Sequence, residues 1–143
     1  MGKKILVLGT GAQGTTVAKR LDLEPNVDKI ICADYDEAAA KELAASLNKA
    51  EGYFCNASDK NQITPLLEGC DLVVNALPLA FGKNVIDAAL EAKVNYQDFA
   101  APEGFEDTWE KCMYRLLGEY NEKFKEAGIL GIMGTGSAPG TMC

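Results

Sequence analysis

The sequence predicts an α/β fold: a doubly wound, six-stranded parallel sheet with helices on both faces. Short apolar runs alternate with helical segments along the chain, and the loops between them are short. The first run, KILVL at residues 4–8, is apolar throughout. Continuous apolar strands are typical of parallel sheets covered on both faces, and strand–helix alternation produces such sheets. Right-handed crossovers then favour the strand order 3-2-1-4-5-6.

Hydrophobic periodicity and capping residues place the elements in order. Strands are expected at residues 4–8, 29–33, 53–55, 72–76, 95–99 and 129–133. Helices are expected at residues 12–23, 36–47, 61–67, 83–92 and 108–127. Asp36 is the expected N-cap of the second helix, and Asp107 with Glu110 has the spacing of a capping box before the last one. Gly128 is the expected end of that last helix.

The last helix carries an apolar stripe. Steps of three and four residues place its members on one face, so packing against the core explains the stripe without a cofactor. We expect all of its residues to face the core. They are Trp109, Cys112, Met113, Leu116, Leu117, Tyr120 and Phe124.

Length and charge bound the class of protein. The chain has 143 residues without a linker or repeat, so we expect one domain over residues 1–143. It carries 21 acidic and 14 basic residues, a net charge of −7, which argues against nucleic acid and anionic membranes as partners. There is no histidine. Ser-His-Asp and Cys-His nucleophiles, HExxH metal sites and an imidazole base are therefore excluded.

The cysteines and the N-terminus indicate the compartment. An odd number of cysteines without CxxC spacing predicts small buried side chains in a reducing cytosol and no zinc site. The N-terminal apolar run ends at Gly9, which is too short for a secretory signal, and no stretch is long enough for a membrane span. We expect a cytoplasmic protein. The cysteines are Cys32, Cys55, Cys70, Cys112 and Cys143.

The first strand runs directly into GTGAQG at residues 9–14, a G-x-G-x-x-G motif that opens a helix. Gly9 permits a tight turn, and Gly11 lets the backbone approach a pyrophosphate without a Cβ in the way. Gly14 allows the helix to pack closely on the strand. This context predicts a Rossmann fold that binds a dinucleotide. A glycine-rich turn without a ligand remains the alternative.

Asp34 closes the second strand, 20 residues beyond Gly14. The N–H groups of Ala12 and Gln13 are expected to face the phosphates, and the Asp34 carboxylate to accept hydrogen bonds from the adenosine ribose. No Arg or Lys occurs at residues 35–40 to neutralise a 2′-phosphate. We therefore predict NAD, with NADP disfavoured by roughly tenfold to a hundredfold. Alternatively, Asp34 only caps the second helix.

Other chemistries found on this fold fit less well. Position 13 is glutamine, whereas methyltransferases commonly have glycine there, and no tyrosine has a lysine four residues later, as short-chain reductases require. Redox chemistry with a nicotinamide cofactor is the class that remains.

Four stretches carry a further resemblance: KKILVLGTGAQG at the start, CDLVVNALP at residues 70–78, VNYQDFA at 94–100 and GTGSAPG at 134–140. With these, the whole chain resembles the N-terminal NAD(P)-binding domain of the saccharopine dehydrogenase family, which includes lysine 6-dehydrogenase and carboxynorspermidine dehydrogenase. The resemblance implies that the end of the fourth strand runs beside the pyrophosphate and the nicotinamide ribose. It also implies that the loop after the third strand, Asn56 to Ser58, flanks the adenine, although related sequences often have Asp at position 56.

Motif and resemblance together give one set of expected cofactor-binding residues. They are Gly9, Gly11, Ala12, Gln13, Gly14, Asp34, Tyr35, Asn56, Ala57, Asn75, Ala76, Leu77 and Pro78. No catalytic residue is assigned. Asp98 is a weak candidate and Glu103 a weaker one, because both are expected at the carboxyl edge of the sheet, where a carboxylate can also serve as a plain loop or cap residue.

The resemblance implies an oxidoreductase that acts on the CH–NH group of an amino acid such as saccharopine or lysine. In that family the G-x-x-P-G segment leads into a second, substrate-holding domain, so we expect the catalytic domain after residue 143 to be absent. The chain would then bind cofactor without turnover and could form a homodimer through its apolar surface. The alternatives are a free-standing NAD(H)-sensing module, like a TrkA-type ligand-gating domain, and a relic that binds nothing.

Overall fold

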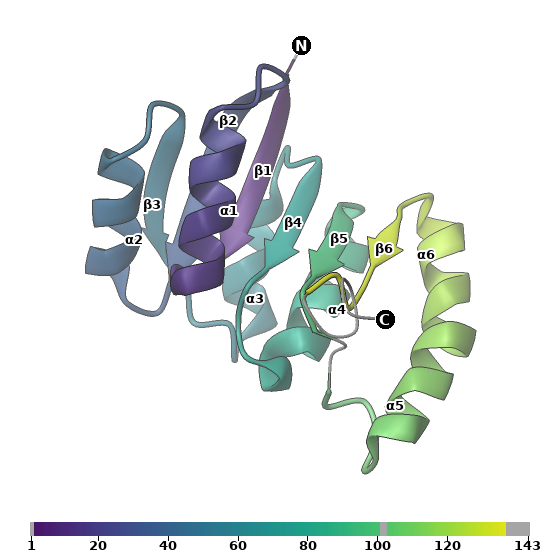
Figure 1. Cartoon of the computed structure of the whole chain (residues 1–143). Helices are drawn as coiled ribbons and strands as arrows, with labels where there is room; N and C mark the ends of the chain where they lie inside the picture. The colour runs from purple at the N-terminus through teal and green to yellow at the C-terminus, as the bar shows by residue number, and fades with distance from the viewer. Residues whose placement is uncertain (1, 101–102, 137–143) are drawn as a thin grey trace.

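A computed structural model describes residues 2–100 and 103–136. These residues form one sheet of six parallel strands in the order β3-β2-β1-β4-β5-β6 (Figure 1), which confirms the predicted fold and strand order. The strands are β1 (Lys3–Leu8), β2 (Val27–Asp34), β3 (Ala50–Phe54), β4 (Leu72–Asn75), β5 (Asn95–Asp98) and β6 (Gly131–Ile132).

Helical segments connect the strands. They are α1 (Ala12–Asp22), α2 (Glu37–Ala45), α3 (Lys60–Ile63), η1 (Thr64–Leu67), η2 (Leu79–Phe81), α4 (Gly82–Ala92), α5 (Trp109–Arg115), η3 (Leu116–Tyr120) and α6 (Asn121–Ala127). In Figure 1, α1 and α2 cover one face of the sheet, and α3 and α4 cover the other. The helix built from α5, η3 and α6 lies beyond the β6 edge.

The core is split by the sheet into two clusters of buried side chains. Along β1, Ile5 and Val7 point into the cluster that contains Ala18 of α1 and Leu43 of α2. Leu6 and Leu8 point into the larger cluster, which α3, α4 and the last helix complete. Side chains alternate between the faces of a strand, so a strand covered on both faces must be apolar at every position. This explains the unbroken KILVL run.

Both edge strands differ from their predicted bounds. β3 begins at Ala50 rather than at residue 53, because parallel pairing with β2 defines it and its side chains are too exposed to leave an apolar pattern. Gly52 of β3 brings α2 close, since a Cβ there would meet the Ala40 carbonyl oxygen at 2.6 Å. β6 is shorter than predicted, because the Ile129 N–H instead bonds the Phe124 carbonyl and helps to end α6.

The start of the last helix corrects the predicted capping box. Thr108, not Asp107, is the N-cap, and its hydroxyl accepts a hydrogen bond from the Lys111 N–H. The Asp107 carboxylate instead accepts from the Lys111 ammonium group. Asp36 caps α2 by accepting from the Ala39 N–H, and Gly128 ends α6 with a φ of 70°, both as predicted.

Only part of the predicted apolar stripe faces the core. Cys112, Leu116, Tyr120 and Phe124 are buried, whereas the side chains of Trp109 and Leu117 are 60% and 75% exposed. The buried residues recur every four positions. In an α-helix of 3.6 residues per turn, each such step would place the next residue further around the helix, so the four would not share one face. The wider π-helical turn η3 keeps them on one face instead. A pattern read at α-helical spacing could not reveal this.

The described cysteines are free thiols. Cys32, Cys55 and Cys112 are buried, as predicted, whereas Cys70 is only half-buried. Burial raises the pKa of Cys32 and of Cys55 to about 11. Cys143 lies outside the described residues.

Candidate functional site

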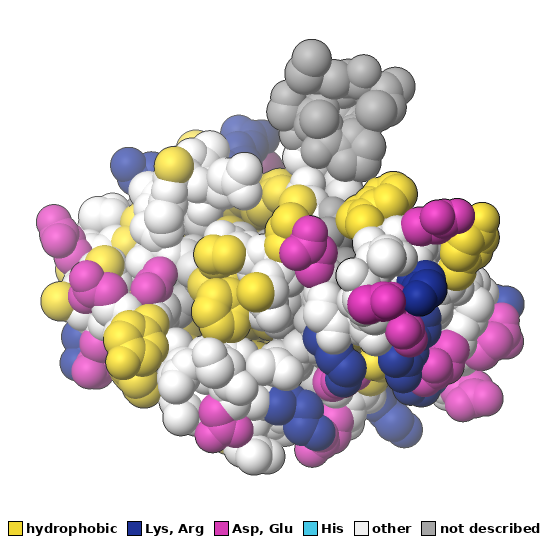
Figure 2. All heavy atoms as spheres, turned by 90° about the horizontal axis from the view of Figure 1, so that it is seen from below, with side chains coloured by type: hydrophobic (Ala, Val, Ile, Leu, Met, Phe, Trp, Pro, Cys, Tyr) yellow, Lys and Arg dark blue, Asp and Glu magenta, His cyan; other side chains and the backbone are white. Residues whose placement is uncertain are grey.

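The site lies where the parallel strands end. All six strands point the same way, so their carboxyl ends form one edge of the sheet, at the bottom of Figure 1. Figure 2 looks onto this edge: hydrophobic and uncharged surface occupies the middle of the view, and most charged side chains lie toward its periphery. In doubly wound sheets, ligands bind in the crevice where the strand order reverses, here between β1 and β4.

The glycine turn between β1 and α1 packs closely against the start of α1, as the motif predicts. Gly9 has a φ of 92°, a backbone conformation that favours glycine. A Cβ on Gly14 would lie 1.8 Å from the Gly9 carbonyl oxygen, so only glycine lets α1 pack this closely on the turn. A Cβ on Gly11 would meet nothing within 4 Å. The protein itself therefore does not require glycine at position 11, and the space there is open to a ligand.

The start of α1 offers unoccupied donors to an anion. Gly11 is the N-cap without a side-chain bond, and the first turn contains no acidic residue. The first N–H groups of a helix lack intrahelical acceptors, so those of Ala12 and Gln13 are free to bind phosphate oxygens. Both residues are exposed.

Asp34 holds the end of β2 against the glycine turn. Its Oδ2 accepts from the Thr10 N–H at 2.6 Å and from the Thr10 hydroxyl at 2.9 Å. Its Oδ1 accepts from the Asp36 N–H at 3.0 Å. The alternative in which Asp34 only caps the second helix is wrong, because the cap of α2 is Asp36.

The Asp34 carboxylate is ionised at neutral pH. Partial burial raises its pKa, but hydrogen bonds from the backbone of Asp36, Thr10 and Tyr35 and from the Thr10 hydroxyl outweigh that effect, and the net pKa lies below the ordinary value. Asp34 is half-buried, so part of it faces solvent.

A cavity of about 460 Å³ opens beside Asp34. It brings together Tyr35, Asn56, Ala57 and Leu77, all predicted to bind the cofactor, with Ser58 of the same loop. The loop keeps its shape through the Asn56 side chain, whose Oδ1 accepts from the Ser58 N–H at 3.1 Å. An aspartate at position 56 could accept the same bond, so the departure from the family's pattern leaves the loop intact.

The NALP segment follows β4 and borders the glycine turn. The Ala76 N–H bonds the Leu8 carbonyl at 2.8 Å, and a Cβ on Gly9 would meet the Ala76 carbonyl oxygen at 2.9 Å. Leu77 lines the cavity beside Asp34. Pro78 is exposed and precedes η2, and Asn75 is buried. This segment therefore connects the two halves of the carboxyl edge.

Two further cavities continue along the edge toward β5 and β6. A small one, about 40 Å³, is lined by Gln13, Asn75, Leu77 and Asp98, among others. The next, about 410 Å³, shares Gln13 and continues to Thr135 and Gly136. Leu77 joins the first cavity to the small one, and Gln13 joins the small one to the third. The edge thus presents an elongated path that starts at Asp34 and passes the glycine turn.

Asp98 is not an open acid or base. It is 2% exposed and accepts from the Tyr96 hydroxyl and the Gly134 N–H, both at 2.7 Å. Burial raises its pKa, and these two hydrogen bonds act in the opposite direction without cancelling the effect. Glu103, the weaker candidate, is exposed. The geometry gives neither carboxylate a catalytic position.

Sequence reasoning missed several residues that shape the site. Thr10 ties Asp34 to the turn, and Phe81 completes the cavity beside Asp34. The Asn84 side chain donates to the carbonyl oxygens of Ala57 and Ser58, both at 3.0 Å, and so fixes the predicted adenine loop from α4. A local motif could have shown Thr10, since it lies inside the glycine turn. Asn84 acts across 27 residues, which no short pattern reveals.

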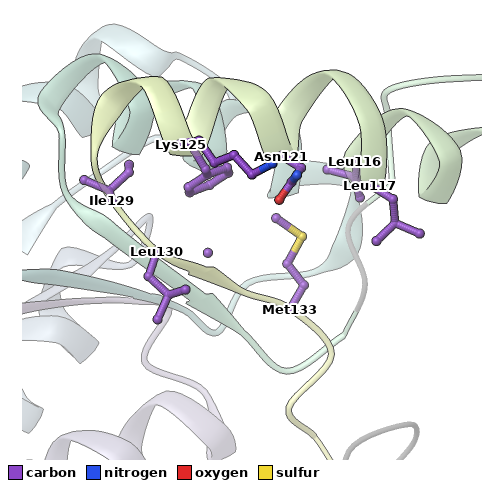
Figure 3. Close-up of a pocket in the computed structure, with 9 residues that line it drawn as sticks. Leu116, Leu117, Asn121, Lys125, Ile129, Leu130 and Met133 are labelled. Atoms are coloured by element: carbon purple, nitrogen blue, oxygen red, sulfur yellow. The ribbon is translucent and has the colours of Figure 1, made fainter.

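An apolar groove of about 370 Å³ lies elsewhere, between the last helix and β6 (Figure 3). Leu117, Leu130 and Met133 line it, and its one cation, Lys125, pairs with Glu122. The groove residues include no free helix N-terminus of the kind that favours phosphate binding. Nothing among the described residues identifies an occupant, so the homodimer stays a prediction.

Two other kinds of feature are absent from residues 2–100 and 103–136. No group of three or more potential metal-ligating side chains occurs there. No helix in that part of the chain is long and apolar enough to cross a membrane.

The strand order, the glycine turn and the free helix N-terminus beside an ionised acid define a Rossmann domain of the dinucleotide-binding kind. Residues 5–132 match the family described as the saccharopine dehydrogenase NADP binding domain. The chain therefore belongs to this family, as the sequence resemblance indicated. Of the 134–140 segment that contributed to that resemblance, residues 137–140 lie outside the described residues.

Two curated relatives are similar over most of the chain. Carboxyaminopropylagmatine dehydrogenase from Synechocystis sp. is 31% identical over 147 residues, which cover 96% of this chain and 35% of the relative. Carboxynorspermidine synthase from Vibrio alginolyticus is 30% identical over 162 residues, which cover 96% of this chain and 37% of the relative. The chain thus spans about a third of the length of these relatives.

Solved structures share the fold. Apo saccharopine dehydrogenase (L-Glu forming) from Saccharomyces cerevisiae superposes with a TM-score of 0.77 at 23% identity, over 97% of this chain and 28% of that one. GenD2 from gentamicin A biosynthesis, solved in complex with NAD, superposes with a TM-score of 0.67 at 18% identity, over 93% of this chain and 34% of that one. Both matches show that the fold of this chain is shared with these structures.

Proposed function

We propose that this domain binds NAD in preference to NADP, with the adenosine ribose on Asp34 and the pyrophosphate on the N–H groups of Ala12 and Gln13. One observation carries the preference: an ionised carboxylate, held by Thr10 and Asp36, borders the cavity expected to hold the adenosine. The ribose hydroxyls of NAD can donate to it, whereas a 2′-phosphate would add negative charge beside it.

The segment that directly follows Asp34 offers no cation to offset a 2′-phosphate. Residues 35–40 contain no Arg or Lys, and the first turn of α2 adds the acidic Glu37. The next cation along the helix, Lys41, already pairs with Glu37 at 2.7 Å. The family is named for NADP binding. The preference for NAD does not follow from that name, and we assign it to Asp34 and its neighbours in this chain.

A thermal-shift panel with NAD, NADH, NADP and NADPH tests this function. At a hundred times its dissociation constant, a ligand stabilises the folded state by about 2.7 kcal/mol, which raises Tm by roughly 5–10 °C at this size. We expect this shift with NAD and a smaller one with NADP at equal concentration. Asp34→Asn should narrow the difference between the Tm shifts with NAD and with NADP, because asparagine lacks the negative charge but keeps an oxygen that accepts a hydrogen bond from the ribose.

Asp36→Asn is the matched control for that variant. It removes a charge two residues away and keeps a good N-cap for α2, so the preference for NAD should persist. No shift with any of the four dinucleotides would refute binding. Equal or larger shifts with the 2′-phosphorylated forms would refute the role of Asp34.

We further propose that the enzyme containing this domain transfers hydride between the nicotinamide ring and a carbon that carries nitrogen. The supporting observations are the family and the names of the relatives, which refer to carboxynorspermidine and carboxyaminopropylagmatine. These names favour a carboxylated polyamine over lysine as the substrate class. Hydride transfer needs cofactor and substrate held in contact, so the present chain should bind NAD without turnover.

A further inference from the structure

A chain of hydrogen bonds joins the ends of β4, β5 and β6 under the middle of the carboxyl edge. The Leu77 N–H donates to Asn75 Oδ1, and Asn75 Nδ2 donates to the Tyr96 hydroxyl, both at 3.1 Å. The Tyr96 hydroxyl donates to Asp98 Oδ2, and the Gly134 N–H donates to Asp98 Oδ1, both at 2.7 Å. All of these donors lead toward one carboxyl group.

The direction of this chain indicates that Asp98 is ionised. The carbonyl oxygen of Asn75 accepts from Leu77, so its amino group must donate to Tyr96. The hydroxyl of Tyr96 then has its own proton for Asp98, which accepts at both oxygens. A protonated Asp98 would have to donate at one of them and would leave the Tyr96 proton without this acceptor.

The charge on Asp98 is buried among neutral groups. Its hydrogen-bond donors are a phenol and a backbone amide, and within the described part of the chain no Lys or Arg forms an ion pair with it. Burying a charge without an ionic partner is costly unless another group offsets it. Such a carboxylate attracts any cation that binds nearby.

Asp98 lies on the path expected to hold the nicotinamide end of the cofactor. The adenosine half is assigned to Asp34 at β2 and the phosphates to the glycine turn, so the nicotinamide half must extend toward β4 and β5. Asp98 ends β5 and lines the small cavity with Gln13 of the glycine turn and Leu77 of the NALP segment. The nicotinamide ring is a cation when oxidised and neutral when reduced.

We propose that Asp98 determines the redox preference of the site: its buried charge favours the oxidised dinucleotide over the reduced one. This inference rests on the proposed function, because it requires the cofactor in the cleft. Tyr96 and Gly134 are positioning residues that hold the carboxylate at the end of β5.

Calorimetric titration of NAD⁺, NADH and ADP into the wild type and Asp98→Asn tests the proposal. The variant should lose about threefold to tenfold more affinity for NAD⁺ than for NADH, because only the oxidised ring carries the charge that Asp98 attracts. ADP lacks the nicotinamide half, so its affinity should be unchanged. Asp22→Asn is the matched control: Asp22 is also buried and accepts from the Asn48 and Lys49 N–H groups, but at the end of α1.

Equal losses for NAD⁺ and NADH in Asp98→Asn, or the same selective loss in Asp22→Asn, would overturn the proposal. The wild type offers a test that needs no variant, because it should bind NAD⁺ more tightly than NADH, and the reverse order would also overturn it. Failure of the proposed function is a distinct result, in which the wild type binds neither ADP nor either dinucleotide.

Discussion

Gly11→Val should abolish dinucleotide binding and leave the domain folded. A Cβ at position 11 would meet nothing within 4 Å beyond its chain neighbours, and the backbone has φ −69° and ψ −164°, an extended conformation outside the left-handed region that favours glycine. The added methyl groups occupy the space through which a pyrophosphate would approach Ala12 and Gln13. Losing two hydrogen bonds to a charged group, at about 1.5–3 kcal/mol each, lowers affinity by about a hundredfold or more.

The measurement combines calorimetric affinity for NAD with the thermal unfolding of the free protein. Valine is a poorer N-cap than glycine, so Tm should fall by no more than about 4 °C. Gly118→Val is the control, because Gly118 is exposed on η3 and a Cβ there also meets nothing within 4 Å. It should bind NAD as the wild type does. Wild-type affinity in Gly11→Val would place the phosphates elsewhere.

Gly14→Ala should damage the fold itself. The new Cβ would lie 1.8 Å from the Gly9 carbonyl oxygen and 2.8 Å from the Gly9 carbonyl carbon, and both are backbone atoms that no rotamer change can move. Either α1 or the glycine turn must shift. Overpacking of this kind lowers the free energy of unfolding by about 3 kcal/mol, which lowers Tm by roughly 10 °C at this size.

Thermal and urea unfolding of the ligand-free protein measure this effect. Gly118→Ala adds the same methyl group at an open helical position, where it should stabilise by about 0.5–1 kcal/mol. The two Gly→Ala changes should alter the free energy of unfolding in opposite directions. This difference separates the effect of close packing at Gly14 from the general effect of removing a glycine. A Tm for Gly14→Ala within 1–2 °C of the wild type would contradict the close approach of α1 to the turn.

The sequence was sufficient to predict the architecture because strands that are buried in the sheet appear in the sequence as local apolar runs. β1, β2 and β4 are buried on both faces and read as apolar runs, and short loops with right-handed crossovers leave one favoured strand order. Two predictions that failed, the bounds of β3 and the core-facing residues of the last helix, each have a local structural cause. β3 is an edge strand without a burial pattern, and the π-helical turn η3 changes which residues of the last helix face the core.

The site was predictable only where one motif contains it. Gly9, Gly14 and Asp34 belong to one strand–helix–strand unit formed by β1, α1 and β2, so their spacing alone places them together. The hydrogen bonds from Asn84 to Ala57 and from Asn75 to Tyr96 join residues that are distant in sequence, and they appear only once the sheet brings their elements side by side. Sequence also could not show that Asp98 is enclosed rather than open to a substrate.

A crystal structure with bound NAD tests the central claim most directly. The account predicts the pyrophosphate within hydrogen-bond distance of the Ala12 and Gln13 N–H groups and the adenosine ribose on the Asp34 carboxylate, with the nicotinamide half toward β5. Density for the dinucleotide at another surface, such as the groove beside β6, or an adenosine that avoids Asp34, would contradict it.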